Sequence, residues 1–342
     1  MESTPITTAT HQLLLGRTME RAQARTVVSD IFSGQTTPVQ VASFLTALRM
    51  KGESAEEIAG MAEGMRDHAV PLPGEWSDLL DTCGTGGDRS GTFNISTTVA
   101  FVAASHGLKV AKHGNRSASS QCGSADVLEA LGVQIELSPE QAAQLLEAHD
   151  VTFLFAPRYH PAMRHVGPVR RELGFPTVFN LLGPLCNPLK PHRQVLGVYK
   201  PELVDLMAGA LQALGIRRAL VVHGHGGLDE LSLAGPSQVA EVLPDGTLRR
   251  YQADPTQYGL TPAPIAALVG GDAVTNAEII RGVLSGEIRD ARREAVVWNA
   301  AAALWIGGVA SDLSEGVRLA SETLDNGSAL RKLESFAAAT RI

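Results

Sequence analysis

Residues 79–114 read "LLDTCGTGGDRSGTFNISTTVAFVAASHGLKVAKHG", and this stretch shows how most of the chain is built. A short apolar run leads into a glycine-rich turn, then into a helical stretch that stops at Gly107, and then into a second apolar run. Glycine often follows the last helical turn because it adopts the left-handed conformation without steric cost. A strand, a helix and a strand in this order predict a βαβ unit with two parallel strands.

The same alternation continues along the chain. Further apolar runs that read as strands lie at 151–157, 194–199 and 218–224, and helical segments lie at 124–132, 138–150 and 200–215. We therefore predict an α/β domain with a mostly parallel central sheet. Ligands in such sheets bind beyond the carboxyl ends of the strands. Three unusual loops fall at such ends: "GTGGD" (84–88), "KHGN" (112–115) and "HGHGGLDE" (223–230).

The N-terminal part of the chain reads as helical. Residues 37–52 place Thr37 as an N-cap, Pro38 at the first helical position and Gly52 after the end, an arrangement typical of a helix. Residues 54–69 read as a second amphipathic helix. No strand-like run precedes the alternating region, so we expect a separate helical unit.

A Pro- and Gly-rich break, "PLPGEW" at 71–76, separates the two patterns. We expect a small all-helical domain over residues 1–72 and a large α/β domain over residues 73–342. The stretch near 160–190 is basic and then rich in Pro and Asn, and it interrupts the alternation. We expect this excursion to pack against the N-terminal helices.

Composition excludes several classes of protein. The net charge of −7 argues against a nucleic-acid binder, which would carry a basic patch. The three cysteines are odd in number and fit no zinc spacing, so a reduced, cytoplasmic setting is expected. The first residues lack the pattern of a signal peptide, and no apolar run reaches the roughly 18 residues of a membrane span.

The first loop lies within "DTCGTGGDRSGTFNIST", residues 81–97. Its glycines, 84, 86 and 87, let the backbone turn tightly and bring N–H groups onto an anion. The side chains of Asn94, Ser96 and Thr97 follow at a helix start, where negative charge is favoured. The loop is neither a P-loop nor a GxGxxG motif, and taken alone it equally fits an ordinary strand-to-helix connection.

The second loop lies within "KHGNRSASSQCGSADVL", residues 112–128. Lys112 supplies a compact positive charge suited to phosphate. The side chains that follow it offer hydrogen bonds to phosphate or ribose oxygens: Asn115, Ser117, Ser119 and Ser120. Ser124 and Asp126 fit routine capping of the next helix. A solvated loop explains those two residues well, but it explains the polar density around Lys112 poorly.

The third loop carries the adjacent carboxylates of Asp229 and Glu230. Carboxylates beside phosphate-binding loops usually hold Mg²⁺, although an acidic pair alone is more often a solvent-facing turn. His223 and His225 lack a third nitrogen or sulfur ligand at a matching spacing, so we read them as structural rather than zinc-binding.

The basic stretch "MRHVGPVRRELG", residues 163–174, offers Arg164, Arg170 and Arg171. Arginine pairs with carboxylates in a bidentate manner. For Arg171, beside Glu172, helix-surface charge is the simpler reading. Arg170 lies off that face, so we expect it to point into a cleft.

In this order, these pieces resemble the anthranilate phosphoribosyltransferase family over nearly the whole chain. The matching motifs are "GTGGD", "FNIST", "KHGNRSASSQCGSADVLEALG", "HPAMRHVGPVRRELG", "FNLLGPLCNP" and "HGHGGLDELS". The resemblance implies transfer of the phosphoribosyl group of 5-phosphoribosyl 1-diphosphate (PRPP) to the amine of anthranilate, the second step from chorismate to L-tryptophan. It also implies a helical domain beside a large α/β domain, and a homodimer formed through the helical domain.

The resemblance also assigns residues, position by position. PRPP binding is implied for Gly84, Gly87, Asp88, Thr92, Asn94, Ile95, Ser96, Thr97, Lys112, His113, Gly114, Asn115, Arg116, Ser117, Ala118, Ser119, Ser120 and Ser124. Anthranilate binding is implied for Gly84, Asn115 and Arg170, with His113 and Pro157 as walls of its route. Mg²⁺, two ions per active site, is implied at Ser96, Asp229 and Glu230.

The sequence departs from the family pattern in two places. Gly226 stands where an acidic residue is common in the turn before "GLDE", and Phe175-Pro176 stands where an aliphatic residue and Arg are common. Neither position is among the implied contacts.

No catalytic acid, base or nucleophile stands out in the sequence. Lys112, Asn115 and Arg170 are expected to act by electrostatics and positioning, because an aromatic amine is already neutral near pH 7. The alternatives are a nucleoside phosphorylase of the same fold group and a homologue that has lost catalysis and binds nucleic acid. The charge of −7 and the intact "NRSASS" and "GLDE" motifs argue against the second alternative.

Overall fold

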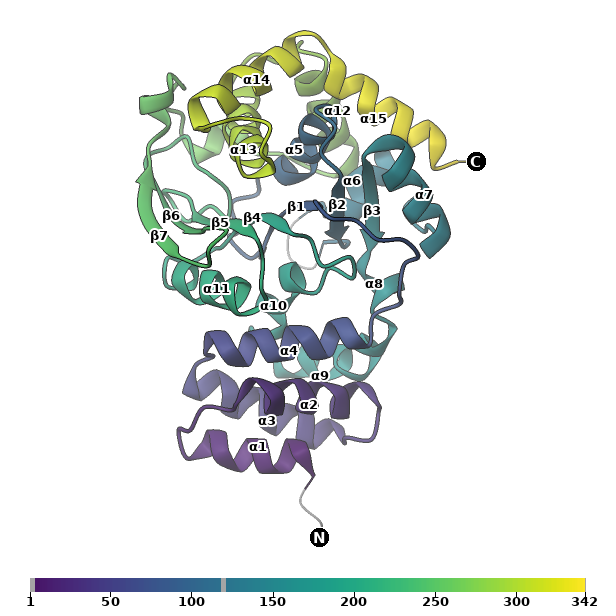
Figure 1. The fold of residues 1–342 in the computed structure, drawn as a ribbon, viewed down its shortest axis with the longest axis vertical. Helices are drawn as coiled ribbons and strands as arrows, with labels where there is room; N and C mark the ends of the chain where they lie inside the picture. The colour runs from purple at the N-terminus through teal and green to yellow at the C-terminus, as the bar shows by residue number, and fades with distance from the viewer. Residues whose placement is uncertain (1–3, 118–120, 342) are drawn as a thin grey trace.

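The computed structural model describes residues 4–117 and 121–341 (Figure 1). Four helices form a stack at the N-terminal end: α1 (Pro5–Leu14), α2 (Arg21–Phe32), α3 (Pro38–Lys51) and α4 (Ala55–Asp67). α3 begins at a capping box in which Thr37 and Gln40 bond each other's backbone N–H, and Ser54 and Glu57 form the same box before α4. Both helix starts therefore follow from local sequence.

In the described part of the remaining chain, a seven-stranded sheet has the order β3-β2-β1-β4-β5-β6-β7. The first five strands in chain order are parallel to one another: β1 (Leu80–Gly84), β2 (Val110–Gly114), β3 (Val151–Phe155), β4 (Arg193–Gly197) and β5 (Arg218–His223). β6 (Ser237–Val242) and β7 (Leu248–Ala253) add an antiparallel edge. The predicted fold class, a small helical domain beside a mostly parallel α/β domain, is confirmed.

Helices cover both faces of the sheet (Figure 1). On one face α5 (Ile95–Ala104) and α13 (Ala291–Gly307) pack on the strands and on each other. Further helices surround this pair: α6 (Ser124–Ala130), α7 (Pro139–His149), α12 (Ala273–Leu284), α14 (Leu313–Asp325) and α15 (Ser328–Ala339), with the short η3 (Pro255–Tyr258) and η4 (Ile265–Leu268). On the other face α11 (Glu202–Ala213) lies between the sheet and α4.

The excursion consists of five short helical segments: α8 (Ala156–Tyr159), η1 (Pro161–His165), α9 (Gly167–Leu173), α10 (Phe179–Leu182) and η2 (Gly183–Leu185). α9 contacts α3, η1 contacts α2 and α10 contacts α4. Val166, Val169 and Phe179 share one apolar cluster with the N-terminal helices and with the α11 face of the sheet. This apolar core includes residues from both sides of position 72, so the domain boundary at residue 72 stays a proposal.

Across residues 4–117 and 121–341, no helix combines the length and apolar character that crossing a bilayer requires.

Candidate functional site

Three loops meet at the carboxyl ends of the parallel strands. The N–H of Gly86, in the loop after β1, donates to Asp229 Oδ2 at 2.7 Å. The N–H of Ser96, in the first turn of α5, donates to Glu230 Oε1 at 3.1 Å. Residues 229 and 230 follow β5, so the structure brings together the glycine loop and the acidic pair that the sequence placed at one sheet edge.

This meeting depends on glycines at the strand ends. A Cβ on Gly84, the last residue of β1, would lie 2.2 Å from Asp229 Oδ2. A Cβ on Gly197, the last residue of β4, would lie 1.5 Å from the Asp229 carbonyl oxygen. Only a residue without a side chain allows the acidic loop to cross these ends.

Lys112 connects the first loop to the second. Its ammonium is buried and donates to the Thr82 carbonyl at 2.6 Å and to Ser96 Oγ at 3.3 Å. Burial lowers the pKa of Lys112, while the charge of Asp81 opposes that shift. The lysine therefore lies beneath the start of α5 and fixes the Ser96 hydroxyl, rather than reaching into solvent.

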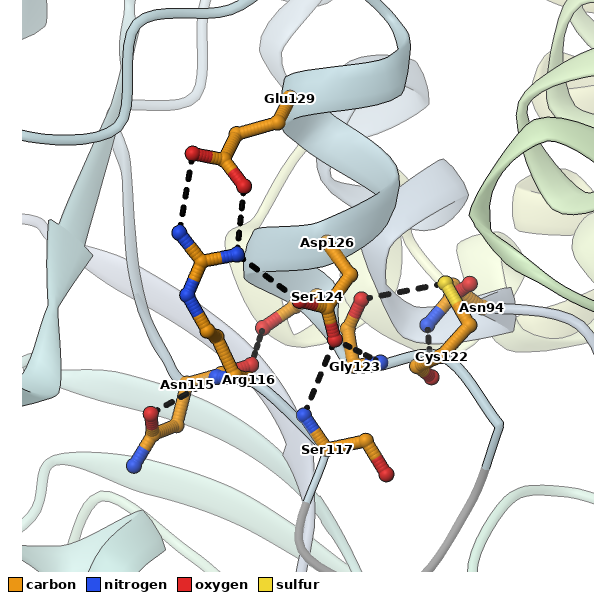
Figure 2. Close-up of polar contacts among 9 residues, drawn as sticks. All are labelled: Asn94, Asn115, Arg116, Ser117, Cys122, Gly123, Ser124, Asp126 and Glu129. Carbon is orange, nitrogen blue, oxygen red and sulfur yellow. Dashed lines mark hydrogen bonds and ion pairs between the residues drawn. The ribbon is translucent and has the colours of Figure 1, made fainter.

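Arg116, Ser117 and Gly123, in the described parts of the second loop, bond to α6 (Figure 2). Asp126 Oδ2 accepts hydrogen bonds from the N–H groups of Ser117 (3.0 Å) and Gly123 (2.8 Å). Arg116 forms ion pairs with Asp126 and Glu129, so its guanidinium is bound to the helix. Any contribution of Arg116 to an anion site would therefore come from its backbone.

The expected cap of this helix is partly wrong. Gly123, not Ser124, is the N-cap of α6, and the Asp126 carboxylate accepts a hydrogen bond from the Gly123 N–H. Ser124 Oγ instead donates to the Asn115 carbonyl at 3.3 Å, which holds the turn after β2. The expected ligand contacts at Ala118, Ser119 and Ser120 lie outside the described residues.

The acidic pair is more enclosed than its sequence context indicated. Asp229 is half-buried and Glu230 is buried, so the pair is not the solvent-facing turn that an acidic pair most often forms. Burial raises the pKa of both carboxyls well above the ordinary range. The charge of Asp88 adds to the rise at Asp229, and the charge of Asp229 adds to the rise at Glu230. The site thus concentrates negative charge that a cation would relieve.

One oxygen of this cluster lacks a hydrogen-bond donor among the residues that the structure describes. Asp88 Oδ2 is buried there without a partner, while its Oδ1 accepts from the Ser90 N–H at 3.3 Å. Within residues 4–117 and 121–341, no three His, Cys, Asp or Glu side chains converge as a complete metal site. A cation held here by Asp229 and Glu230 would need further oxygen ligands from a hydroxyl, water or substrate.

The remaining predicted residues lie around this centre. Arg170, on α9, is half-buried, donates to Asn180 Oδ1 at 3.4 Å and lies 5.7 Å over the Phe179 ring. Burial lowers its pKa. Among the described residues, no contact joins Arg170 to the acidic pair, so its place in a shared site stays a prediction. Asn115 is exposed at the end of β2.

Three histidines near the strand ends pack against other protein groups. The rings of His113 and His160 lie edge to face, with centroids 5.1 Å apart. Burial, and then the neighbouring His160, lower the pKa of His113 to about 3, so it is neutral near pH 7. His223 is used structurally: its Nδ1 lies 2.8 Å from the Val198 carbonyl oxygen.

Sequence reasoning missed two buried asparagines that hold these loops. Asn299, on α13, accepts from the Leu231 N–H at 2.8 Å and donates to the Leu231 carbonyl at 3.0 Å, directly after the acidic pair. Asn276, on α12, donates to Asn94 Oδ1 at 3.0 Å. Both lie in helical segments without a motif. In the sequence, the only sign of their role is that each is a polar residue among apolar helix positions.

Most of the chain is similar to known families of transferases. Residues 7–69 match the family model described as "Glycosyl transferase family, helical bundle domain", and residues 77–330 match "Glycosyl transferase family, a/b domain". The chain is 54% identical over 330 residues to the anthranilate phosphoribosyltransferase of Roseiflexus castenholzii, covering 96% of this chain and 97% of the relative.

Solved structures agree with this result. The anthranilate phosphoribosyltransferase of Thermus thermophilus superposes with a TM-score of 0.93 at 47% identity, covering 98% of this chain and 99% of that one. The Saccharomyces cerevisiae enzyme, in complex with PRPP and Mg, gives a TM-score of 0.89 at 31% identity, with 98% of each chain covered.

Proposed function

Because the chain belongs to the anthranilate phosphoribosyltransferase family, we propose that its three loops divide the transfer reaction among them. The reaction moves the phosphoribosyl group of PRPP to the amine of anthranilate and releases pyrophosphate. The observation that carries the proposal is the pair of hydrogen bonds from Gly86 and Ser96 to Asp229 and Glu230.

PRPP is held by the first two loops. The glycine turn and the start of α5 present backbone N–H groups, and the field of a helix N-terminus favours an anion there. Lys112 adds a buried positive charge directly behind Ser96. We assign PRPP contacts to the following residues: Gly84, Gly87, Asp88, Thr92, Asn94, Ile95, Ser96, Thr97, Lys112, His113, Gly114, Asn115, Arg116, Ser117, Ala118, Ser119, Ser120 and Ser124.

Mg²⁺ fits the acidic loop. The charge of Asp229 raises the pKa of Glu230, and Asp88 Oδ2 is buried without a partner among the described residues. The donor set therefore consists of hard oxygens with excess negative charge. We propose that Ser96, Asp229 and Glu230 hold the metal, with two ions per active site. When bound, Mg²⁺ neutralises charge on the pyrophosphate leaving group.

Anthranilate is held by Gly84, Asn115 and Arg170. The anomeric carbon of PRPP becomes oxocarbenium-like as its bond to pyrophosphate breaks, and the anthranilate nitrogen then bonds to that carbon and loses a proton. The protein's contribution is to hold the amine in line and to stabilise charge on the leaving group. An aromatic amine near pH 7 needs no base to become nucleophilic, and His113 is neutral there.

We further propose a homodimer formed through the helical domain. Leu14, Leu15, Val39 and Met50 are each at least 67% exposed, and they lie at the end of α1 and on α3. Because α1 and α3 pack against each other, these exposed apolar side chains lie on one helix pair, as at an interface. Light scattering of Val39→Glu with Met50→Glu should give half the mass of the parent; an unchanged mass would contradict this interface. The burial of all three cysteines fits a reducing cytoplasm.

The activity test follows anthranilate fluorescence. Anthranilate should disappear only when PRPP and Mg²⁺ are both present. Phosphorolysis of thymidine or uridine without use of anthranilate would replace the proposal with a nucleoside phosphorylase. Tight binding of single-stranded DNA at moderate salt, without turnover, would favour the nucleic-acid-binding alternative.

A further inference from the structure

Asn94 is the N-cap of α5, yet its side chain does not cap the helix. An asparagine at this position normally accepts a hydrogen bond from the second or third N–H of its own helix. Here Asn94 Nδ2 donates to the Cys122 carbonyl at 3.2 Å, a contact visible in Figure 2. Its Oδ1 accepts from Asn276 Nδ2 at 3.0 Å. The amide is thus drawn away from the first turn of α5.

Asn276 has its own orientation fixed by the backbone. It is 2% exposed, and its Oδ1 accepts from the Gly271 N–H at 2.8 Å. A Cβ on Gly270 would lie 2.2 Å from the same oxygen, so the loop before α12 closes tightly around it. With its oxygen committed to Gly271, Asn276 presents only N–H groups to Asn94, and only the oxygen of Asn94 is a suitable partner.

The orientation of the Asn94 amide affects the proposed PRPP site in two places. Asn94 Oδ1 is occupied by Asn276 and does not cap α5, and the Ser96 N–H in the first turn donates to Glu230 instead. Asn94 Nδ2 is aimed at the second loop, where it holds the Cys122 carbonyl. One side chain thereby links α5 to the end of the second loop, 28 positions away in sequence.

We propose that Asn276 is a positioning residue for PRPP binding, which acts by fixing the orientation of the Asn94 amide. This inference rests on the proposed function of the site. It differs from a purely structural role, in which Asn276 would only anchor the loop at 270–271 to α12. The two roles differ in whether the effect of Asn276 passes through Asn94.

A double-mutant cycle separates the two roles. PRPP affinity is measured by calorimetry in the presence of Mg²⁺ for the parent, Asn94→Ala, Asn276→Ala and the double variant. Asn276→Ala should weaken PRPP binding about tenfold, the factor expected for one well-oriented hydrogen bond, and leave the KM for anthranilate unchanged. In the Asn94→Ala background, Asn276→Ala should weaken PRPP binding by less than about twofold. A full, additive loss in that background would overturn the proposal.

Two further variants keep the test independent of folding. Asn276→Asp retains an acceptor for the Gly271 N–H but no longer donates to Asn94, so it should lose PRPP affinity as Asn276→Ala does; parent-like affinity would assign the residue to loop anchoring alone. Thr323→Val removes a partly buried hydrogen bond to His106, which follows the C-terminal end of α5, and should lower the melting temperature without changing PRPP affinity. A parent that fails to bind PRPP would instead refute the proposed function.

Discussion

Gly84 and Asp229 lie so close that any side chain at position 84 would meet the Asp229 carboxylate: a Cβ there would be 2.2 Å from Oδ2. The end of β1 and the acidic loop after β5 therefore form one unit, although 145 positions separate the two residues (229 − 84 = 145). The absence of a side chain at one residue allows the carboxylate of the other to accept the Gly86 N–H.

Gly84→Ala should therefore displace Asp229. Forcing a methyl group into a packed site costs about 1–3 kcal/mol, so kcat/KM should fall about ten- to hundredfold and the Mg²⁺ midpoint should rise. Gly183→Ala is the matched control, since nothing lies within 4 Å of its added Cβ. Equal activity in the two variants would show that the acidic loop tolerates displacement.

Asp229→Ala combined with Glu230→Gln should lose most turnover while the fold persists. The two carboxyls are proposed to hold Mg²⁺ against pyrophosphate, so the double variant should need far more Mg²⁺ to recover any rate. The measurement is a magnesium titration of the variant beside the parent, with thermal melts of both. Parent-like turnover with the parent's magnesium midpoint would show that these two residues only form a turn and do not hold the metal.

The same carboxyls predict a pH dependence of stability in the absence of metal. Burial raises the pKa of Asp229 to about 7 and of Glu230 to about 8, from ordinary values of 3.8 and 4.5. The native state therefore holds more protons than the unfolded state between about pH 4 and pH 8, and these groups make stability fall as pH rises through that window.

Asp229→Asn with Glu230→Gln should abolish that contribution. The melting temperature of the variant minus that of the parent should grow from about pH 5 to pH 8. Mg²⁺ should stabilise the parent more at pH 8 than at pH 6, because it binds the ionised carboxylates. A difference between parent and variant that is flat with pH would contradict the raised pKa values.

Arg170→Ala should weaken anthranilate use far more than PRPP use. A charge-assisted hydrogen bond contributes roughly 1.5–3 kcal/mol, so the KM for anthranilate should rise about ten- to hundredfold. Arg171→Ala, at the next and exposed position, is the control and should match the parent. Equal losses for both substrates in Arg170→Ala would indicate a different role.

Lys112→Met should raise the KM for PRPP while anthranilate binding survives. The change nearly conserves volume but removes the charge that holds Ser96 Oγ, and it leaves the buried Asp81 without its cation. A lower melting temperature should accompany the loss. Lys109→Met, near the start of the same strand and paired with exposed Glu147, should change neither quantity by much. Unchanged PRPP kinetics in Lys112→Met would remove this lysine from the PRPP site.

The order of residues along the chain was enough to predict the architecture and the neighbourhood of the site. Alternating apolar runs and helices predicted the parallel sheet, because residue periodicity reports local backbone structure directly. Loops at the ends of parallel strands must share one edge, so the glycine turn, Lys112 and the acidic pair could be placed together from their positions in the sequence.

The pairing of individual side chains depends instead on how the helices and strands pack. Arg116 pairs with Asp126 and Glu129 on α6, Glu230 is buried beside Ser96, and Asn276 turns the amide of Asn94 away from its own helix. No local pattern marks these partners, because a buried polar group takes whichever donor or acceptor the packing brings within reach. Asn94 and Asn276 stand 182 positions apart in sequence, and only the packing of α12 beside α5 and α6 brings their amides into contact.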